Sequence, residues 1–177
     1  TPPKTPSSSP AILDLVGCIQ GSGHLAVEML IDQSASLKVT DPENRRVDAA
    51  RAALDGLLAL ATGRGTDNPK VDVALSSFSD AYRPVRTWTA LDEASAPALR
   101  VAIAGFAKRN RGTDTDFINA LNGARSSLAD HSAEVTAGGE DAPCKTVLLF
   151  TDGQYDIAVR ATQAATGSTT SRSAPRR

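Results

Sequence analysis

The sequence contains few aromatic residues and no long apolar run, and both features limit the folds it can adopt. Phe, Trp and Tyr make up 4% of the 177 residues, so a core has to be built from Leu, Val, Ile and Ala. No apolar stretch reaches the roughly 18 residues that a membrane-spanning helix requires, so membrane insertion is not expected. The hydrophobic fraction of 41% is typical of a globular chain, and the length predicts one domain.

Charge and cysteine content exclude further classes of protein. The 19 basic and 20 acidic side chains give a formal net charge of −1, which argues against nucleic acid as a partner. Two cysteines are too few for a zinc site with four thiolate ligands. Residue 1 is Thr, and no targeting peptide is visible. We interpret the chain as a processed protein or an internal piece of one, which leaves secretion open.

The two ends of the chain differ in composition from its middle. Residues 1–11 are rich in Pro and Ser, which predicts an extended linker. Residues 161–177 are small, polar or basic, which predicts a disordered tail. The folded domain is therefore expected over residues 12–160.

Between these ends, strand-like and helix-like segments alternate. Apolar runs predict strands at residues 25–31, 71–78 and 146–150, with an antiparallel edge strand at 85–88. Helical spacing of apolar residues is found at 46–61, 95–106 and 117–128. Gly17, Gly21 and Gly23 are interpreted as part of a plain loop before the first strand. The alternation predicts an α/β fold, with a mostly parallel sheet covered by helices on both faces.

Oxygen-bearing side chains follow the first and the last predicted strand. Asp32, Ser34 and Ser36 alternate after the first strand, and Asp152 comes after the last. Ligands of open α/β sheets bind beyond the carboxyl ends of the strands, so these groups are expected to meet. Thr113, where a helix opens, can add a hydroxyl. Such donors suit Mg²⁺, which retains several waters and can accept one more carboxylate from outside.

Four segments, in this order, resemble the von Willebrand factor A family over about residues 24–157. They are Ile-Asp-Gln-Ser-Ala-Ser at 31–36, residues 71–80, Gly-Thr-Asp-Thr at 112–115 and Leu-Leu-Phe-Thr-Asp-Gly at 148–153. The resemblance implies a Rossmann-like, three-layer, doubly wound sheet with strand order 3-2-1-4-5-6. It also implies a secreted-type protein.

The same resemblance implies a metal-ion-dependent adhesion site. Its residues would be Asp32, Ser34, Ser36, Thr113 and Asp152. The implied cofactor is Mg²⁺ (or Mn²⁺ or Ca²⁺), with the two Ser hydroxyls bound directly and the Asp groups mostly through water. Whether Thr113 contacts the metal site would depend on whether a partner ligand is bound. An acidic residue of that partner protein would complete the metal's ligand shell.

The C-terminal part of the sequence departs from the family pattern. After Val159 nothing resembles the family's fifth and sixth strands, so we expect a C-terminally truncated, incomplete sheet. The fourth strand would then be an exposed apolar edge. We expect either a less stable fold or an edge covered by pairing with another chain.

The two cysteines are placed to pair. Cys18 comes before the first predicted strand and Cys144 before the fourth, and the family's strand order makes these strands parallel neighbours. Both sulfurs are therefore expected at the end of the sheet opposite the metal site, which predicts a disulfide bond, with two buried thiols as the alternative. A disulfide favours an extracellular or cell-surface location.

Three functions stay open on this sequence. The first is a cation-dependent, adhesion-type module that binds a carboxylate of a partner protein. The second is a structural or assembly domain with a vestigial metal site. The third, an enzyme, is least favoured because no nucleophile–base pair is visible and His24 and His131 occur far apart in unrelated contexts.

Several polar residues also have structural interpretations. The loop of Asp32, Ser34 and Ser36 can cap the helix that follows it. Asp116 is expected to be a helix N-cap. The basic run 108–111 either complements a helix C-terminus or steers acidic partners towards the metal.

Overall fold

The N-terminal part of the fold differs from the expected one. The computed structural model describes residues 10–63 and 68–152; the predicted tail and all but two residues of the predicted linker lie outside this part. Helix α1 (Pro10–Ser22) includes those two residues, so the linker prediction was wrong for them, and the loop interpretation of Gly17 and Gly21 was wrong as well. Pro is well tolerated at a helix start, because its missing N–H needs no partner there. Gly23, at φ +65°, ends the helix.

The described strands form one mixed sheet with the order β3-β2-β1-β4. They are β1 (His24–Asp32), β2 (Lys70–Phe78), β3 (Tyr82–Ala90) and β4 (Cys144–Phe150). Strand β1 is central and pairs in parallel with β2 and β4, while β3 pairs with β2 in the antiparallel sense. The predicted order of the first four strands and the antiparallel edge strand are confirmed.

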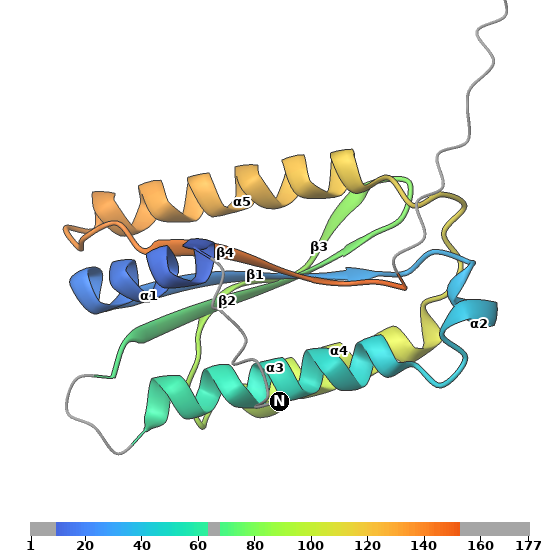
Figure 1. Cartoon of the computed structure of the whole chain (residues 1–177), viewed down its shortest axis with the longest axis horizontal. Helices are drawn as coiled ribbons and strands as arrows, with labels where there is room; N and C mark the ends of the chain where they lie inside the picture. The colour runs from blue at the N-terminus through green and yellow to red at the C-terminus, as the bar shows by residue number, and fades with distance from the viewer. Residues whose placement is uncertain (1–9, 64–67, 153–177) are drawn as a thin grey trace, which may run out of the picture.

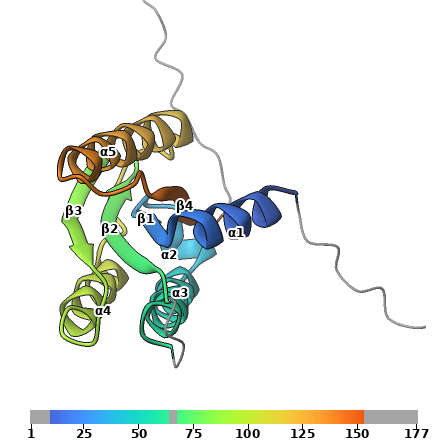
Figure 2. The same cartoon turned by 90° about the vertical axis from the view of Figure 1, so that its left-hand side faces the viewer.

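Helices cover both faces of this sheet (Figure 1). Helices α3 (Arg45–Thr62) and α4 (Ala96–Ala104) lie on one face, and α5 (Phe117–Ala137) lies on the other. A short helix, α2 (Leu37–Thr40), follows β1, and a 3₁₀ turn, η1 (Gly105–Lys108), follows α4. Helix α1 lies against β4 (Figure 2). This is the predicted three-layer α/β architecture, and none of the described helices is long and apolar enough to cross a bilayer.

The main core lies between the sheet and helices α3 and α4. Alternate residues of β1 face this side, since successive side chains of a strand point to opposite faces. The β1 residues on this face are Leu25, Val27, Met29 and Ile31, and they pack with apolar residues of β2, α3 and α4. The apolar cluster on the α5 side is smaller and consists of Leu30, Phe78, Ala120 and Ala124. This leaves room for polar groups beneath α5.

Strand β4 lies at one edge of the described sheet. One side of it pairs with β1, and no other described strand pairs with its second side. Leu149 on this strand is 39% exposed. The expected fourth-strand edge is therefore present in the part of the chain that the structure describes.

A disulfide bond joins α1 to the start of β4. Cys18 and Cys144 are bonded, with their Cα atoms 5.9 Å apart, as predicted. Leu15 and Ile19 of α1 pack against the main core, but no residue of this helix is buried. The covalent link is therefore a major part of what holds α1 on the domain.

Replacing both cysteines by serine removes a cross-link between positions that are 126 residues apart. Loop-closure entropy sets an upper limit of about 5 kcal/mol on the resulting loss of stability. We expect the Cys18→Ser/Cys144→Ser variant to unfold at a lower urea concentration and to exchange the amide protons of α1 faster. Wild type in reducing agent is the matched control, and an unchanged urea midpoint in both would contradict this role.

Candidate metal centre

Oxygen-bearing side chains from separate segments converge at the carboxyl end of the sheet. Asp32, the last residue of β1, is fully buried. Ser34 and Ser36 follow it in the turn that leads to α2, and Asp152 comes shortly after β4. Because β1 and β4 are parallel neighbours, both chain segments leave the sheet on the same side.

Hydrogen bonds connect these side chains to one another. Ser34 Oγ lies 3.0 Å from Ser36 Oγ, and Ser36 donates to Asp152 Oδ2 at 3.2 Å. Asp32 accepts at Oδ1 from the backbone N–H of Ser34 and at Oδ2 from the Thr151 hydroxyl, both at 2.8 Å. The structure therefore places the Asp152 carboxylate beside the two serine hydroxyls, which the candidate site requires.

Thr113 lies near this cluster because the preceding residue, Gly112, pairs with Ser34. Gly112 forms an isolated β-bridge with Ser34, and its carbonyl accepts from the N–H of Ala35 at 2.8 Å. A Cβ at position 112 would lie 2.1 Å from Ser79 Cβ, so the close approach requires glycine. The Thr113 side chain is exposed, and no hydrogen bond joins its hydroxyl to the described cluster.

Helix capping does not account for the serines. Ser36 directly precedes α2, but its side chain makes no capping hydrogen bond and donates to Asp152 instead. Thr40, in α2 itself, also donates to Asp152 Oδ2, a contact that the sequence did not suggest. Asp116, by contrast, is a true N-cap, as predicted, because its Oδ1 accepts from the N–H of Asn119 at 2.9 Å.

Burial raises the pKa of Asp32 above its ordinary value. Hydrogen bonds from Ser34 and Thr151 partly offset this effect, and the nearby charge of Asp152 adds to it. Two carboxylates that approach each other away from water disfavour ionisation. Two carboxylates and two hydroxyls at one point form a set of hard oxygen donors, which fits a divalent cation such as Mg²⁺.

Comparison with known proteins identifies the family. The family model for the von Willebrand factor type A domain matches residues 27–154. The chain belongs to the von Willebrand factor type A family. Curated protein sequences include no significant match to it.

Solved structures show the same fold at low sequence identity. The PilB minor pilin from Streptococcus sanguinis is 18% identical, with a TM-score of 0.50, over 74% of this chain and 30% of that chain. The vWF domain of the type V pili tip protein Mfa5 from Porphyromonas gingivalis is 20% identical, with a TM-score of 0.45, over 75% and 38%. A von Willebrand factor type A protein from Catenulispora acidiphila is 16% identical, with a TM-score of 0.48, over 70% and 25%. The chain thus spans well under two thirds of each of these structures.

Arg46 holds the loops of this A domain together beneath the candidate centre. Its buried guanidinium donates to the backbone carbonyls of Asp32 at 3.0 Å and of Phe106 at 3.1 Å, and to Asp41 Oδ2 at 2.7 Å. It also bonds the side chain of Asn110. Burial alone would raise the pKa of Asp41, but hydrogen bonds from Arg46 and from backbone N–H groups lower it below its ordinary value. The sequence suggested only a helix start at this position.

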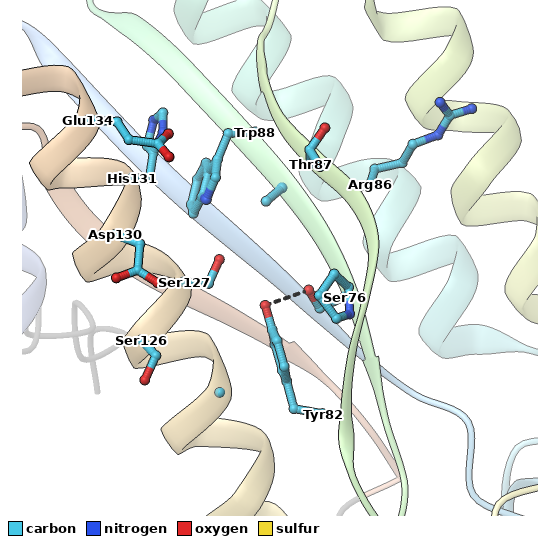
Figure 3. Close-up of a pocket in the computed structure, with 13 residues that line it drawn as sticks. Ser76, Tyr82, Arg86, Thr87, Trp88, Ser126, Ser127, Asp130, His131 and Glu134 are labelled. Carbon is cyan, nitrogen blue, oxygen red and sulfur yellow. Dashed lines mark hydrogen bonds between the residues drawn. The ribbon is translucent and has the colours of Figure 1, made fainter. Parts of the chain in front are cut away.

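A second polar cluster of the A domain lies beneath α5. The fully buried carboxylate of Glu28 accepts hydrogen bonds from Ser76, from Tyr82 at 3.0 Å and from Ser127 at 2.9 Å. These three hydroxyls line a cavity of about 390 Å³ between the sheet and α5 (Figure 3). Burial raises the pKa of Glu28.

The two histidines meet at the end of the A domain opposite the candidate centre. His24 Nε2 lies 2.8 Å from Asp72 Oδ2, and His131 Nε2 lies 2.9 Å from the same oxygen. The expectation that they occupy unrelated contexts was wrong. The parallel register of β1 and β2 and the packing of α5 bring them to one carboxylate, and the sequence carries no local signal of this.

Arg46→Met is expected to destabilise the A domain by about 3–5 kcal/mol, because it leaves the buried Asp41 charge without its partner. In the same variant, the amide protons of residues 105–112 should exchange faster, because Arg46 anchors that segment through Phe106 and Asn110. Arg45→Ala is the matched control, because Arg45 makes an exposed ion pair with Glu43 that contributes at most about 1 kcal/mol. Equal urea midpoints for the two variants would contradict the anchoring role.

Glu28→Gln tests the buried carboxylate through the pH dependence of stability. The pKa of Glu28 is raised above 4.5 in the folded protein, so the folded state binds this proton more tightly than the unfolded chain does. Its contribution to stability is present below pH 4.5 and is lost as pH rises through the raised pKa. We expect the free energy of unfolding of wild type to fall, relative to Glu28→Gln, between pH 4.5 and neutrality in urea titrations. A difference between the two proteins that stays constant over this pH range would contradict the prediction.

Proposed function

We propose that this A domain is a divalent-cation-dependent binding module of the adhesion type, which recognises an acidic group of a partner protein. The observation that carries the proposal is the hydrogen-bonded convergence of Ser34, Ser36 and Asp152 beside the buried Asp32. An arrangement that uses few protein ligands leaves a position for an outside carboxylate, because Mg²⁺ keeps several exchangeable waters.

The five proposed site residues have different roles, which follow from the chemistry of their side chains. Ser34 and Ser36 would hold the cation directly through their hydroxyls, and Asp32 and Asp152 would act mostly through water while balancing its charge. Thr113 is proposed to engage when the partner's carboxylate binds; its exposed side chain, beside the Gly112–Ser34 bridge, supports this. The bound cation would supply the positive charge that the partner's carboxylate recognises.

A cationic surface next to the cluster supports an acidic partner. A cavity of about 460 Å³ extends from Gln33 and Gly112 and is lined by one acidic side chain, Asp80, and four basic ones, those of Arg83, Lys108, Arg109 and Arg111. Asp80 pairs with Arg83 at 3.8 Å, so three of the basic groups remain in excess. These three, Lys108, Arg109 and Arg111, are exposed and lie just before Thr113 in the chain. Positive charge beside a binding site speeds the approach of acidic partners and orients them.

An extracellular or cell-surface location is part of the proposal. The disulfide between Cys18 and Cys144 requires an oxidising compartment to persist. The structurally similar proteins include a minor pilin, a type V pili tip protein, a pilus adhesin from Lactobacillus rhamnosus GG and a proximal thread matrix protein of the mussel byssus. These names agree with an adhesive or structural role outside the cell.

The edge of β4 favours a second candidate function, assembly through strand pairing. Its outer side has no partner strand among residues 10–63 and 68–152, and Leu149 is 39% exposed there. An unpaired strand edge is a template for pairing with another chain. In this alternative the cation has no role.

Titration calorimetry with Mg²⁺ distinguishes the two functions. Wild type should give a saturable heat, and Asp32→Ala should lose at least about 10-fold in affinity, because a buried charge next to the ion is removed. Asp48→Ala, on the exposed surface of α3, is the matched control and should bind Mg²⁺ like wild type. Equal heats for wild type and Asp32→Ala would reject the cation-dependent module. Self-association that depends on protein concentration but not on Mg²⁺ would then support the assembly alternative.

A further inference from the structure

We propose that His24, Asp72 and His131 form a second cation site, which takes Zn²⁺ or a similar borderline transition metal. These residues come from β1, β2 and α5, and they include both histidines of the chain. Their side chains are buried, with 6%, 6% and 10% of the side-chain surface exposed. Two imidazoles and one carboxylate are a ligand set that zinc uses in proteins.

The spacing of the ligand atoms fits one small ion. One ring nitrogen of each histidine and one carboxylate oxygen of Asp72 lie within 4.8 Å of one another. Both Nε2 atoms lie within 2.9 Å of Asp72 Oδ2. Ligand atoms around a tetrahedral zinc ion are about 3.4 Å apart, as follows from bond lengths near 2.1 Å. Shifts of about 0.7 Å in each side chain are therefore enough to exchange the hydrogen bonds to Asp72 for bonds to the metal.

Neighbouring groups hold the two imidazoles in orientations suited to coordination. The ring of Trp88 stacks on His131, with centroids 4.2 Å apart and an interplanar angle of 7°. On the other imidazole, His24 Nδ1 faces Glu140 Oε2 at 3.8 Å. A metal-bound imidazole commonly donates its second N–H to a carboxylate, which fixes the tautomer that ligates. Lys70 holds Glu140 in place, at 2.8 Å from the same oxygen.

Solvent can reach the cluster from two sides. A cavity of about 370 Å³ borders His24 and is also lined by Ser22, Lys70 and Glu140. The cavity in Figure 3 borders His131 and Trp88 on the α5 side. An ion can therefore enter, and a water molecule can supply the fourth ligand, as in zinc sites that have three protein ligands.

The site is separate from the proposed adhesion site. His24 begins β1 and Asp32 ends it, so the two lie about 26 Å apart along the strand. Occupation by Zn²⁺ would tie the starts of β1 and β2 to α5, at the end of the sheet that also carries the disulfide. It would therefore stabilise the folded state in proportion to the concentration of free metal.

The test is a Zn²⁺ titration of the untagged, disulfide-bonded chain after treatment with a chelator, followed by NMR of the imidazole nitrogens. The chain has only two histidines, so every imidazole signal reports on this site. In the hydrogen-bonded cluster, the histidines donate from Nε2 to Asp72. When Zn²⁺ binds at Nε2, the ring proton of each histidine should move to Nδ1. This change in the imidazole signals should saturate at one equivalent of Zn²⁺. A cluster that has only a structural role would leave these signals unchanged, and that result would overturn the proposal.

Two variants locate the ion. His131→Gln can still donate to Asp72 but is a poor zinc ligand, so Zn²⁺ affinity should fall by more than about 100-fold. Asp32→Ala should bind Zn²⁺ at the histidines like wild type, so failure of the adhesion site would leave this result unaffected. If Asp32→Ala loses Zn²⁺ while His131→Gln retains it, the ion binds at the other end of the sheet and the proposal is wrong.

Discussion

Parallel pairing of β1 with β4 is the constraint on which the candidate adhesion site depends. The pairing runs in continuous register from Leu25 with Cys144 to Ile31 with Phe150. It therefore brings the chain segments after Asp32 and before Asp152 out of the sheet side by side. At the opposite end, the same pairing places Cys144 where it can bond Cys18. One strand pair thus positions a polar cluster at one end and a covalent link at the other.

The candidate site is polar, and hydrogen bonds and burial fix the position of Asp32 within it. Asp32 has no exposed surface, and its carboxylate and its backbone carbonyl are both engaged, the latter by Arg46. Burial raises the pKa of Asp32, and the nearby charge of Asp152 adds to this effect. The proposed cation would favour the ionised form of Asp32.

Much of this could be predicted from sequence, because it depends on local signals in a fixed order. The apolar strands in their order predict the fold. The spacing of Asp32, Ser34 and Ser36, with Asp152 after the last strand, predicts the candidate site. Helix α1 escaped prediction because Gly, Pro and Ser weigh against a helix. Its attachment to the domain depends on a disulfide together with the packing of Leu15 and Ile19. The meeting of His24, Asp72 and His131 depends on strand register and on the rotation of α5 about its axis, which no local pattern encodes.

Diffraction from crystals of the chain grown with Mn²⁺, recorded at a wavelength where manganese scatters anomalously, tests the central claim most directly. The account predicts an anomalous peak at about 2.1–2.3 Å from the hydroxyl oxygens of both Ser34 and Ser36, with Asp32 and Asp152 around it. A map in which Mn²⁺ is absent from this point, while Ser36 remains hydrogen-bonded to Asp152, would contradict it.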